Sequence, residues 1–245
     1  MAAIDPITGP DRAAAARARA ALDALAGRAR AGAIPPLAGP HAFDPARAAG
    51  YRPAAVLILF APTRVAPLVA PGGEPGVDVL LVQRSHQLRD HPGQIALPGG
   101  RIEESDAGEV AAALRETHEE IGLHPSRIEV LAQLPPVLVP ISRFVVTPVV
   151  GWTDEADDAT NVEPGEVLHT IRVPVGALLD PSTRTTVTIA GHRSAGFRVP
   201  GGWVWGFTGN LLDHVFTELG WALPWDTGRE VAMSLDPAQG IITPT

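Results

Sequence analysis

The apolar residues of the chain fall into short runs that predict strands separated by turns, with a few helices among them. The runs at 54–62 (AAVLILFAP) and 77–85 (VDVLLVQRS) end at turn or polar residues, a pattern typical of buried strands. The segment at 95–100 (IALPGG) is a strand stub that leads into a double-glycine turn. An apolar-faced helix over 208–220 is closed by its terminal glycine.

Between these segments the same pattern predicts a series of further elements. We expect a helix at about 107–121 and strands at 128–134, 145–152, 185–189 and 196–207. The segment 166–179 is expected to form a strand followed by a short helix. Strands and helices thus mix along the chain with no internal repeat. This order favours an α/β or α+β sheet protein.

Composition supports a single mixed domain with extensions. The chain has 245 residues, 45% of them hydrophobic, and its 25 Gly and 25 Pro suit short strands joined by tight turns. We divide it into an Ala/Arg-rich leader helix and Pro-rich linker (1–53), a main domain (54–225) and a C-terminal tail (226–245). The leader helix is expected to run from near Asp11 to about Ala31 and to attach only loosely.

The charge and the absence of cysteine narrow the class of function. A formal net charge of -8 disfavours a surface for nucleic acid, whereas an anionic small molecule can still bind where a metal and local arginines set the field. With no Cys, disulfides, thiolate metal sites and cysteine nucleophiles are excluded. No apolar run is long enough to span a membrane, so we expect a cytoplasmic protein, with a homodimer through the leader helix left open.

The helix at 107–121 carries the candidate chemistry. Asp106 and Glu109 have the spacing of a capping box at its start, and Gly122 is suited to end it. One stripe of the helix is predicted to face the core: Val110, Leu114, Thr117 and Ile121. A different face carries three carboxylates: Glu116, Glu119 and Glu120.

Three carboxylates on one helix face repel one another unless a positive charge lies among them. Arg115 can supply part of that charge and orient Glu119. Clustered carboxylates also suit Mg²⁺ or Mn²⁺, which prefer oxygen ligands, and the Gly99–Gly100 turn lets a backbone carbonyl join them. A solvated acidic face is the alternative that the helix alone leaves open.

The order of glycine turn, acidic loop and carboxylate helix resembles a known family motif. Residues 100–123 (GRIEESDAGEVAAALRETHEEIGL) look like the Nudix box. Its second half is matched by Arg115, Glu116, Glu119, Glu120, Gly122 and Leu123. Three features depart from the usual pattern: Asp106 replaces Glu, eight residues rather than seven separate it from the arginine, and Thr117 fills an apolar position.

The preceding segment is similar to one branch of this family, the coenzyme A diphosphatases. Residues 80–100 (LLVQRSHQLRDHPGQIALPGG) carry its signature through Arg84, Ser85, Arg89, Gly93, Pro98, Gly99 and Gly100. Val82 and Leu97 stand where Thr and Phe are expected. The resemblance spans roughly residues 54–220 and implies an α/β/α sandwich with a mixed sheet.

The resemblance implies hydrolysis of a nucleoside diphosphate linked to another group, with the roles distributed as follows. Metal ligands are Glu116, Glu119 and Glu120, with a Gly99 or Gly100 carbonyl as a further ligand. Glu166, in the segment NVEPGEV, is the candidate general base, although a helix glutamate can serve instead. Arg84 and Arg89 are expected to grip phosphates, the 3′-phosphate of coenzyme A being an obvious target, unless they are ordinary surface arginines.

Three hypotheses about function follow. The first is hydrolysis of coenzyme A or its derivatives to 4′-phosphopantetheine and adenosine 3′,5′-bisphosphate. The second keeps the chemistry and assigns ADP-ribose, NADH or another nucleoside diphosphate derivative. The third is a non-catalytic nucleotide-sensing module, which the intact set of three helix carboxylates disfavours.

Overall fold

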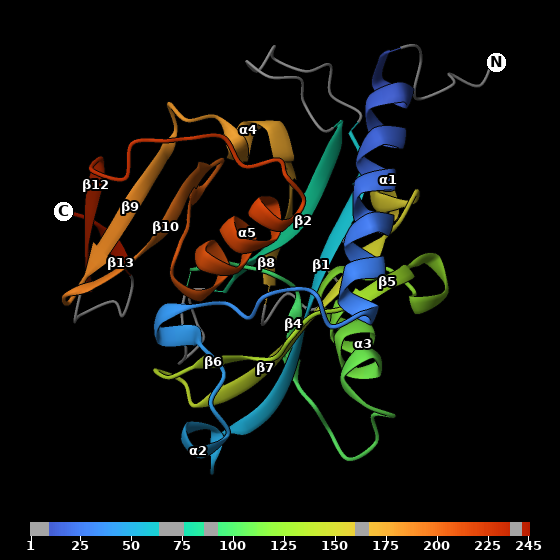
Figure 1. Ribbon diagram of the computed structural model, residues 1–245, viewed down its shortest axis with the longest axis horizontal. Helices are drawn as coiled ribbons and strands as arrows, with labels where there is room; N and C mark the ends of the chain where they lie inside the picture. The colour runs from blue at the N-terminus through green and yellow to red at the C-terminus, as the bar shows by residue number, and fades with distance from the viewer. Residues whose placement is uncertain (1–9, 64–75, 86–92, 160–166, 236–241) are drawn as a thin grey trace.

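The computed structural model describes residues 10–63, 76–85, 93–159, 167–235 and 242–245, in a mixture of helices and strands (Figure 1). The helices are α1 (Pro10–Arg30), α2 (Pro45–Ala48), α3 (Glu109–Ile121), α4 (Val175–Leu179) and α5 (Gly206–Glu218). The strands are β1 (Arg52–Pro62), β2 (Val77–Arg84), β3 (Ile95–Ala96), β4 (Gly99–Arg101), β5 (Glu129–Gln133), β6 (Val137–Val139), β7 (Phe144–Trp152), β8 (Val167–Pro174), β9 (Arg184–Ile189), β10 (His192–Val199), β11 (Gly202–Val204), β12 (Glu230–Leu235) and β13 (Ile242–Pro244).

The first sheet, sheet A, is mixed and has β1 at its centre. Its main path is β3-β2-β1-β7-β5, and β4, β6 and β8 pair with β1, β7 and β2 respectively. Strand β1 runs parallel to β7 and antiparallel to β2 and β4. The predicted mixed sheet is confirmed.

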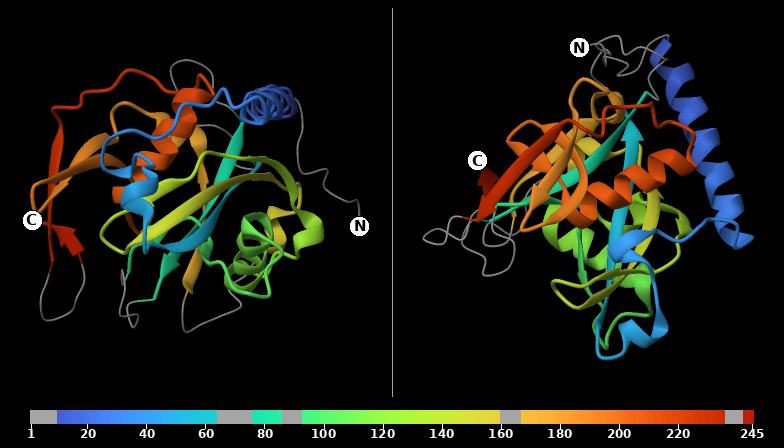
Figure 2. Two further views of the ribbon diagram at one scale, coloured as in Figure 1. Left: turned by 60° about the horizontal axis from the view of Figure 1, so that its bottom comes forward. Right: turned by 60° about the vertical axis from the view of Figure 1, so that its left-hand side comes forward.

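Helices cover both faces of sheet A, as strand alternation along β1 requires. Leu57 and Leu59 belong to the core beneath α3, whereas Ile58 and Phe60 belong to the core beneath α1 and α5. Figure 2 shows α3 on one side of the sheet and α1 and α5 on the opposite side. The predicted α/β/α sandwich is therefore present.

The N-terminal helix is part of the core, so the expectation of a loosely attached leader is wrong. Ala18, Leu22 and Leu25 are almost completely buried, in the same cluster as residues of β1, β2 and β5. Arg19 pairs with Glu129 at 2.6 Å, and Arg28 with Glu218 at 2.8 Å. Spacings of three and four residues place the few leucines on one face, and the alanines let that face approach the sheet closely.

A second sheet, sheet B, has the order β11-β10-β9-β12-β13. The predicted C-terminal tail thus contributes two strands, of which β12 pairs in parallel with β9. Arg184 of β9 is fully buried between the rings of Phe197 and Trp225, and its guanidinium pairs with Asp213 of α5 at 2.6 Å. This contact joins the segment before β12 to the body of the molecule.

Replacing Leu22 with Ala should reduce the free energy of unfolding by about 2–5 kcal/mol, because a fully buried leucine leaves a cavity in the core. Urea unfolding measures the change. Arg17→Ala, at an exposed position of the same helix, is the matched control and should change stability by less than about 0.5 kcal/mol. Equal stability of both variants would mean that α1 contributes little to the fold.

Candidate active site

Helix α3 is placed by a tight contact with β1. Its Ala112 and Ala113 are completely buried. Of the predicted core stripe, Thr117 and Ile121 are buried, whereas Val110 and Leu114 are only partly buried. The Thr117 hydroxyl donates to the Ala113 carbonyl at 2.7 Å, so a polar residue at an apolar position leaves no unpaired group. The helix ends as predicted at Gly122, which has φ 70°.

Asp106 does not cap this helix, so that prediction is wrong. The N-cap is Gly108, and no side chain bonds to the helix start. Instead, Asp106 accepts hydrogen bonds from Nε and Nη2 of Arg115, both at 3.0 Å, and from the Glu103 backbone N–H at 2.8 Å. The planar guanidinium fits a carboxylate through two parallel bonds, and this attraction outweighs the local cap.

The Asp106–Arg115 pair is electrostatically strong. The bonds from Arg115 hold the pKa of the Asp106 carboxyl below its usual range, and the same pair raises the pKa of the guanidinium. Both groups therefore stay charged at neutral pH. The acidic loop before α3 is tied to the middle of the helix by this contact.

The remaining Arg115 donors reach the carboxylate face. Its Nη1 donates to Glu116 at 3.1 Å and to Glu119 at 2.8 Å, and its Nη2 donates to the Arg101 carbonyl at 2.9 Å. The predicted positive charge among the helix carboxylates is confirmed. One arginine thus connects the loop, β4 and α3.

The Gly99–Gly100 backbone lies directly against two of these carboxylates. The Gly99 N–H donates to Oε2 of Glu120 at 3.0 Å, and Glu120 is only 3% exposed. A Cβ at Gly100 would overlap the Glu116 carboxylate, and one at Gly99, whose φ is 149°, would overlap β1. Position 99 therefore requires glycine, and a side chain at position 100 would displace the Glu116 carboxylate.

The side chains present fit a hard divalent cation. Glu116 and Glu120 are one helical turn apart and both lie against the Gly99–Gly100 backbone. Carboxylate and carbonyl oxygens are the ligands that Mg²⁺ and Mn²⁺ prefer. Glu119 points its carboxylate to Arg115 instead. Within the described ranges, no three His, Asp or Glu side chains already converge on one point.

Arg84 lies at the end of β2, on the side of the sheet that α3 covers. Leu80 and Val82 pack in the core beneath α3, and strand alternation puts Arg84 on their face. Its Nε is buried with no hydrogen-bond partner among the described residues, and the residue pairs in register with Val167 of β8. The predicted base Glu166, which precedes Val167, and Arg89 both lie outside the described residues.

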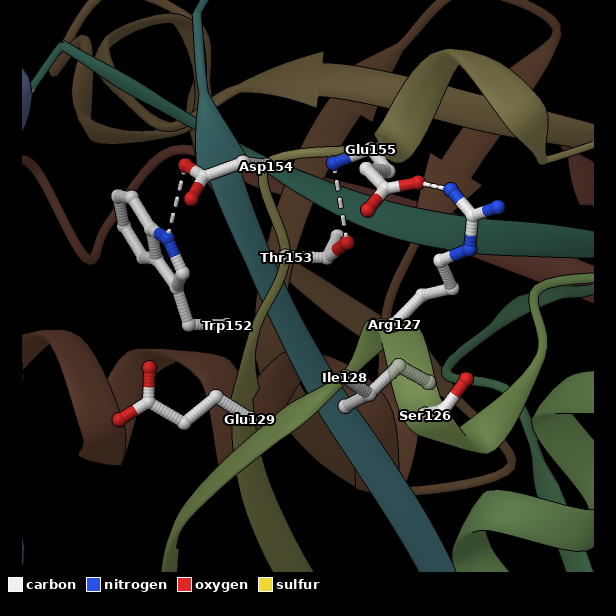
Figure 3. Close-up of a pocket in the computed structure, with 8 residues that line it drawn as sticks. All are labelled: Ser126, Arg127, Ile128, Glu129, Trp152, Thr153, Asp154 and Glu155. Carbon is white, nitrogen blue, oxygen red and sulfur yellow. Dashed lines mark hydrogen bonds and ion pairs between the residues drawn. The ribbon is translucent and has the colours of Figure 1, made fainter.

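A separate surface hollow lies between the segments 126–129 and 152–155 (Figure 3). Its polar groups have partners: Arg127 pairs with Glu155, the Trp152 indole donates to Asp154 at 3.1 Å, and Glu129 pairs with Arg19 of α1. None of the predicted site residues lines it. The candidate site therefore remains at α3 and β4.

Comparison with known proteins decides the family. The model of the NUDIX domain matches residues 59–189, more than half of the chain and inclusive of β4 and α3. The chain belongs to the Nudix family.

Two relatives that are similar in sequence agree with this assignment. The chain is 36% identical over 152 residues to "Uncharacterized Nudix hydrolase NudL" of Enterobacter sp. (strain 638), covering 60% of this chain and 77% of the relative. It is 35% identical over 175 residues to the protein of the same name from Escherichia coli (strain K12 / DH10B), covering 69% and 84%. Among solved structures it is similar to a Nudix hydrolase from M. smegmatis, RenU, with 25% identity, a TM-score of 0.39 and coverage of 51% and 71%.

The protein is thus a Nudix hydrolase that acts on nucleoside diphosphate derivatives, a class of reaction that generally needs a divalent metal ion. In the part of the chain that the structure describes, no helix is long and apolar enough to cross a membrane.

Asp106→Asn should lower kcat/KM for a nucleoside diphosphate derivative by about tenfold, because the charge that holds Arg115 is lost. Asp106→Glu, which restores the usual residue of the box, should retain most of the activity. Steady-state kinetics with matched thermal unfolding curves test both variants. Glu104→Gln removes an exposed carboxylate from the same loop and serves as the control; equal rates for Asp106→Asn and wild type would remove the role of this pair.

Proposed function

We propose that this Nudix hydrolase cleaves the diphosphate of coenzyme A or its derivatives, giving 4′-phosphopantetheine and adenosine 3′,5′-bisphosphate. The observation that carries the proposal is the signature over residues 80–100, which ends in the two glycines that touch the helix carboxylates. The segment that resembles the coenzyme A branch therefore leads directly into the site.

A bound Mg²⁺ or Mn²⁺ would be held by Glu116 and Glu120, with Glu119 and a Gly99 or Gly100 carbonyl as the other proposed ligands. Such an ion neutralises phosphate oxygens and acidifies bound water. The protein's part is to hold the ligands in place before substrate arrives. Arg115 does so through two of the carboxylates and through β4.

Two arginines are proposed to bind the diphosphate. Arg84 has a buried, unpartnered Nε on the face of the sheet that carries α3, and a charged acceptor would satisfy it. Arg89 belongs to the same signature.

Glu166 is proposed as the general base for the attacking water. Its neighbour Val167 pairs with Arg84, so the chain at this position enters the sheet beside the proposed diphosphate contact. Glu119, whose side chain is 46% exposed, is the alternative base on α3.

Product analysis tests the substrate. The purified protein should be incubated with Mg²⁺ or Mn²⁺ and, in separate reactions, with coenzyme A, ADP-ribose and NADH. We expect preferential release of adenosine 3′,5′-bisphosphate and 4′-phosphopantetheine from coenzyme A. Faster cleavage of ADP-ribose or NADH would keep the chemistry and reject coenzyme A as the substrate.

Glu120→Gln and Glu119→Gln should each reduce metal-dependent turnover by about a hundredfold or more, because a neutral amide is a much poorer ligand for a hard cation. The far-UV circular dichroism spectrum should be unchanged. Glu103→Gln, at an exposed loop position, is the control. Full activity of either helix variant would exclude that glutamate from the metal site.

A further inference from the structure

Three arginines from distant parts of the sequence meet at one end of sheet A. Arg52 is the first residue of β1, Arg101 is the last residue of β4, and Arg143 directly precedes β7. Strand register brings them together, since β1 pairs with both of the other strands: Arg52 lies opposite Phe144, and Ala54 opposite Arg101. We call Arg52, Arg101 and Arg143 the arginine patch.

Aromatic rings orient all three guanidinium groups. Arg52 and Arg101 lie 4.4 Å and 5.9 Å from the centre of the Phe144 ring, so their guanidinium carbons are at most about 10 Å apart. Arg143 lies 5.8 Å from the ring of Tyr51. A cation–π contact uses the face of the guanidinium and leaves its in-plane N–H groups available for an acceptor.

In the part of the chain that the structure describes, no carboxylate neutralises this patch. Within the described ranges, none of its arginines forms an ion pair, and the one side-chain hydrogen bond of the patch runs from Arg52 to the Ser142 carbonyl at 3.1 Å. Other arginines of the chain, such as Arg19, Arg115 and Arg172, pair with Asp or Glu. In a protein of net charge -8, three exposed arginines at one end of the sheet, with no ion pair to any described residue, form a local site for an anion.

The backbone at the patch is also strained. Arg143 has φ 54°, in the left-handed region that a side chain with a Cβ rarely adopts. Its carbonyl accepts a hydrogen bond from the Arg52 N–H at 2.9 Å, which fixes the turn against β1. Glycine would meet the backbone requirement at lower cost, so the arginine side chain has a use that the turn itself does not explain.

The patch is one residue from the active site. Gly100 faces Glu116, and successive strand residues point to opposite sides, so the side chain of Arg101 leaves the same strand on the other face. Among the strands that the structure describes, β4 pairs only with β1, and its Gly99 N–H and Arg101 carbonyl bond to Glu120 and Arg115 of α3. The carboxylates and the arginines thus flank one strand edge.

We infer that the arginine patch binds a phosphate dianion, and that the dianion is the phosphomonoester of the substrate, distinct from the diphosphate that is cleaved. A ribose carries its 5′ and 3′ substituents on opposite sides of the ring. A nucleotide lying across the edge of β4 therefore presents its 5′-diphosphate to the carboxylates and its 3′-phosphate to the arginines. This inference rests on the proposed function and moves recognition of the 3′-phosphate from Arg89 to the patch.

The test compares coenzyme A with dephospho-coenzyme A, which lacks only the 3′-phosphate. The variants are Arg52→Gln, Arg101→Gln and Arg143→Gly, the last of which removes the charge and keeps a compatible backbone. We expect the ratio of kcat/KM for coenzyme A to that for dephospho-coenzyme A to fall about tenfold in each variant. Arg193→Gln, at an exposed arginine of sheet B that pairs with Glu230, is the matched control and should leave the ratio unchanged.

A ratio that stays at the wild-type value in all three variants and falls in Arg89→Ala would overturn the inference. Thermal unfolding separates this result from a folding defect, since Arg143→Gly should be at least as stable as wild type.

Calorimetry separates the patch from the proposed function. Adenosine 3′,5′-bisphosphate, AMP and inorganic phosphate are titrated into wild type and the variants. If coenzyme A is not cleaved but adenosine 3′,5′-bisphosphate binds more weakly to the variants than to wild type, the proposed function is rejected and phosphate binding by the patch is supported. Weaker binding of inorganic phosphate with an unchanged substrate ratio assigns the patch to free phosphate; equal binding of all three ligands to all proteins overturns it.

Discussion

The active site depends on the close approach of a glycine backbone to the carboxylates of α3. The Gly99 amide bonds to Glu120, and Gly100 lies where any side chain would collide with Glu116. Two carboxylates held against peptide groups form an oxygen-rich surface before any ion is present. The repulsion between these carboxylates is the cost of the arrangement, and the Arg115 guanidinium offsets it from one side.

The rest of the fold keeps these groups in register. Alanines on the buried face of α3 let the helix lie close to β1, and β4, which contains both glycines, pairs with the same strand, so the helix and the glycines share one support. The opposite face of β1 is covered by α1 and α5, which makes the N-terminal helix a distant but structural part of the site. Arg115 adds the third connection through its paired bonds to Asp106 in the preceding loop.

Much of this was predictable from sequence because it depends on local patterns. Apolar runs predicted the central strands, helical spacing placed the three glutamates on one face, and like-charge repulsion predicted a cation among them. The predictions failed where the contact of a residue is determined by a partner that is distant in the sequence. Asp106 has the spacing of a cap, yet an arginine nine residues away in sequence holds it. The leader helix looked detachable because the sheet that buries it comes later in the chain. The arginine patch has no sequence signal, since only the register of three strands joins its members.

The central claim is that Glu116 and Glu120 hold a divalent ion against the Gly99–Gly100 backbone. Anomalous diffraction from crystals soaked in Mn²⁺ tests it most directly, because the ion is located without reference to turnover. The account predicts a strong anomalous peak within coordination distance of both carboxylates and of a glycine carbonyl. A well-occupied Mn²⁺ peak elsewhere, with these carboxylates bonded only to protein groups, would contradict it.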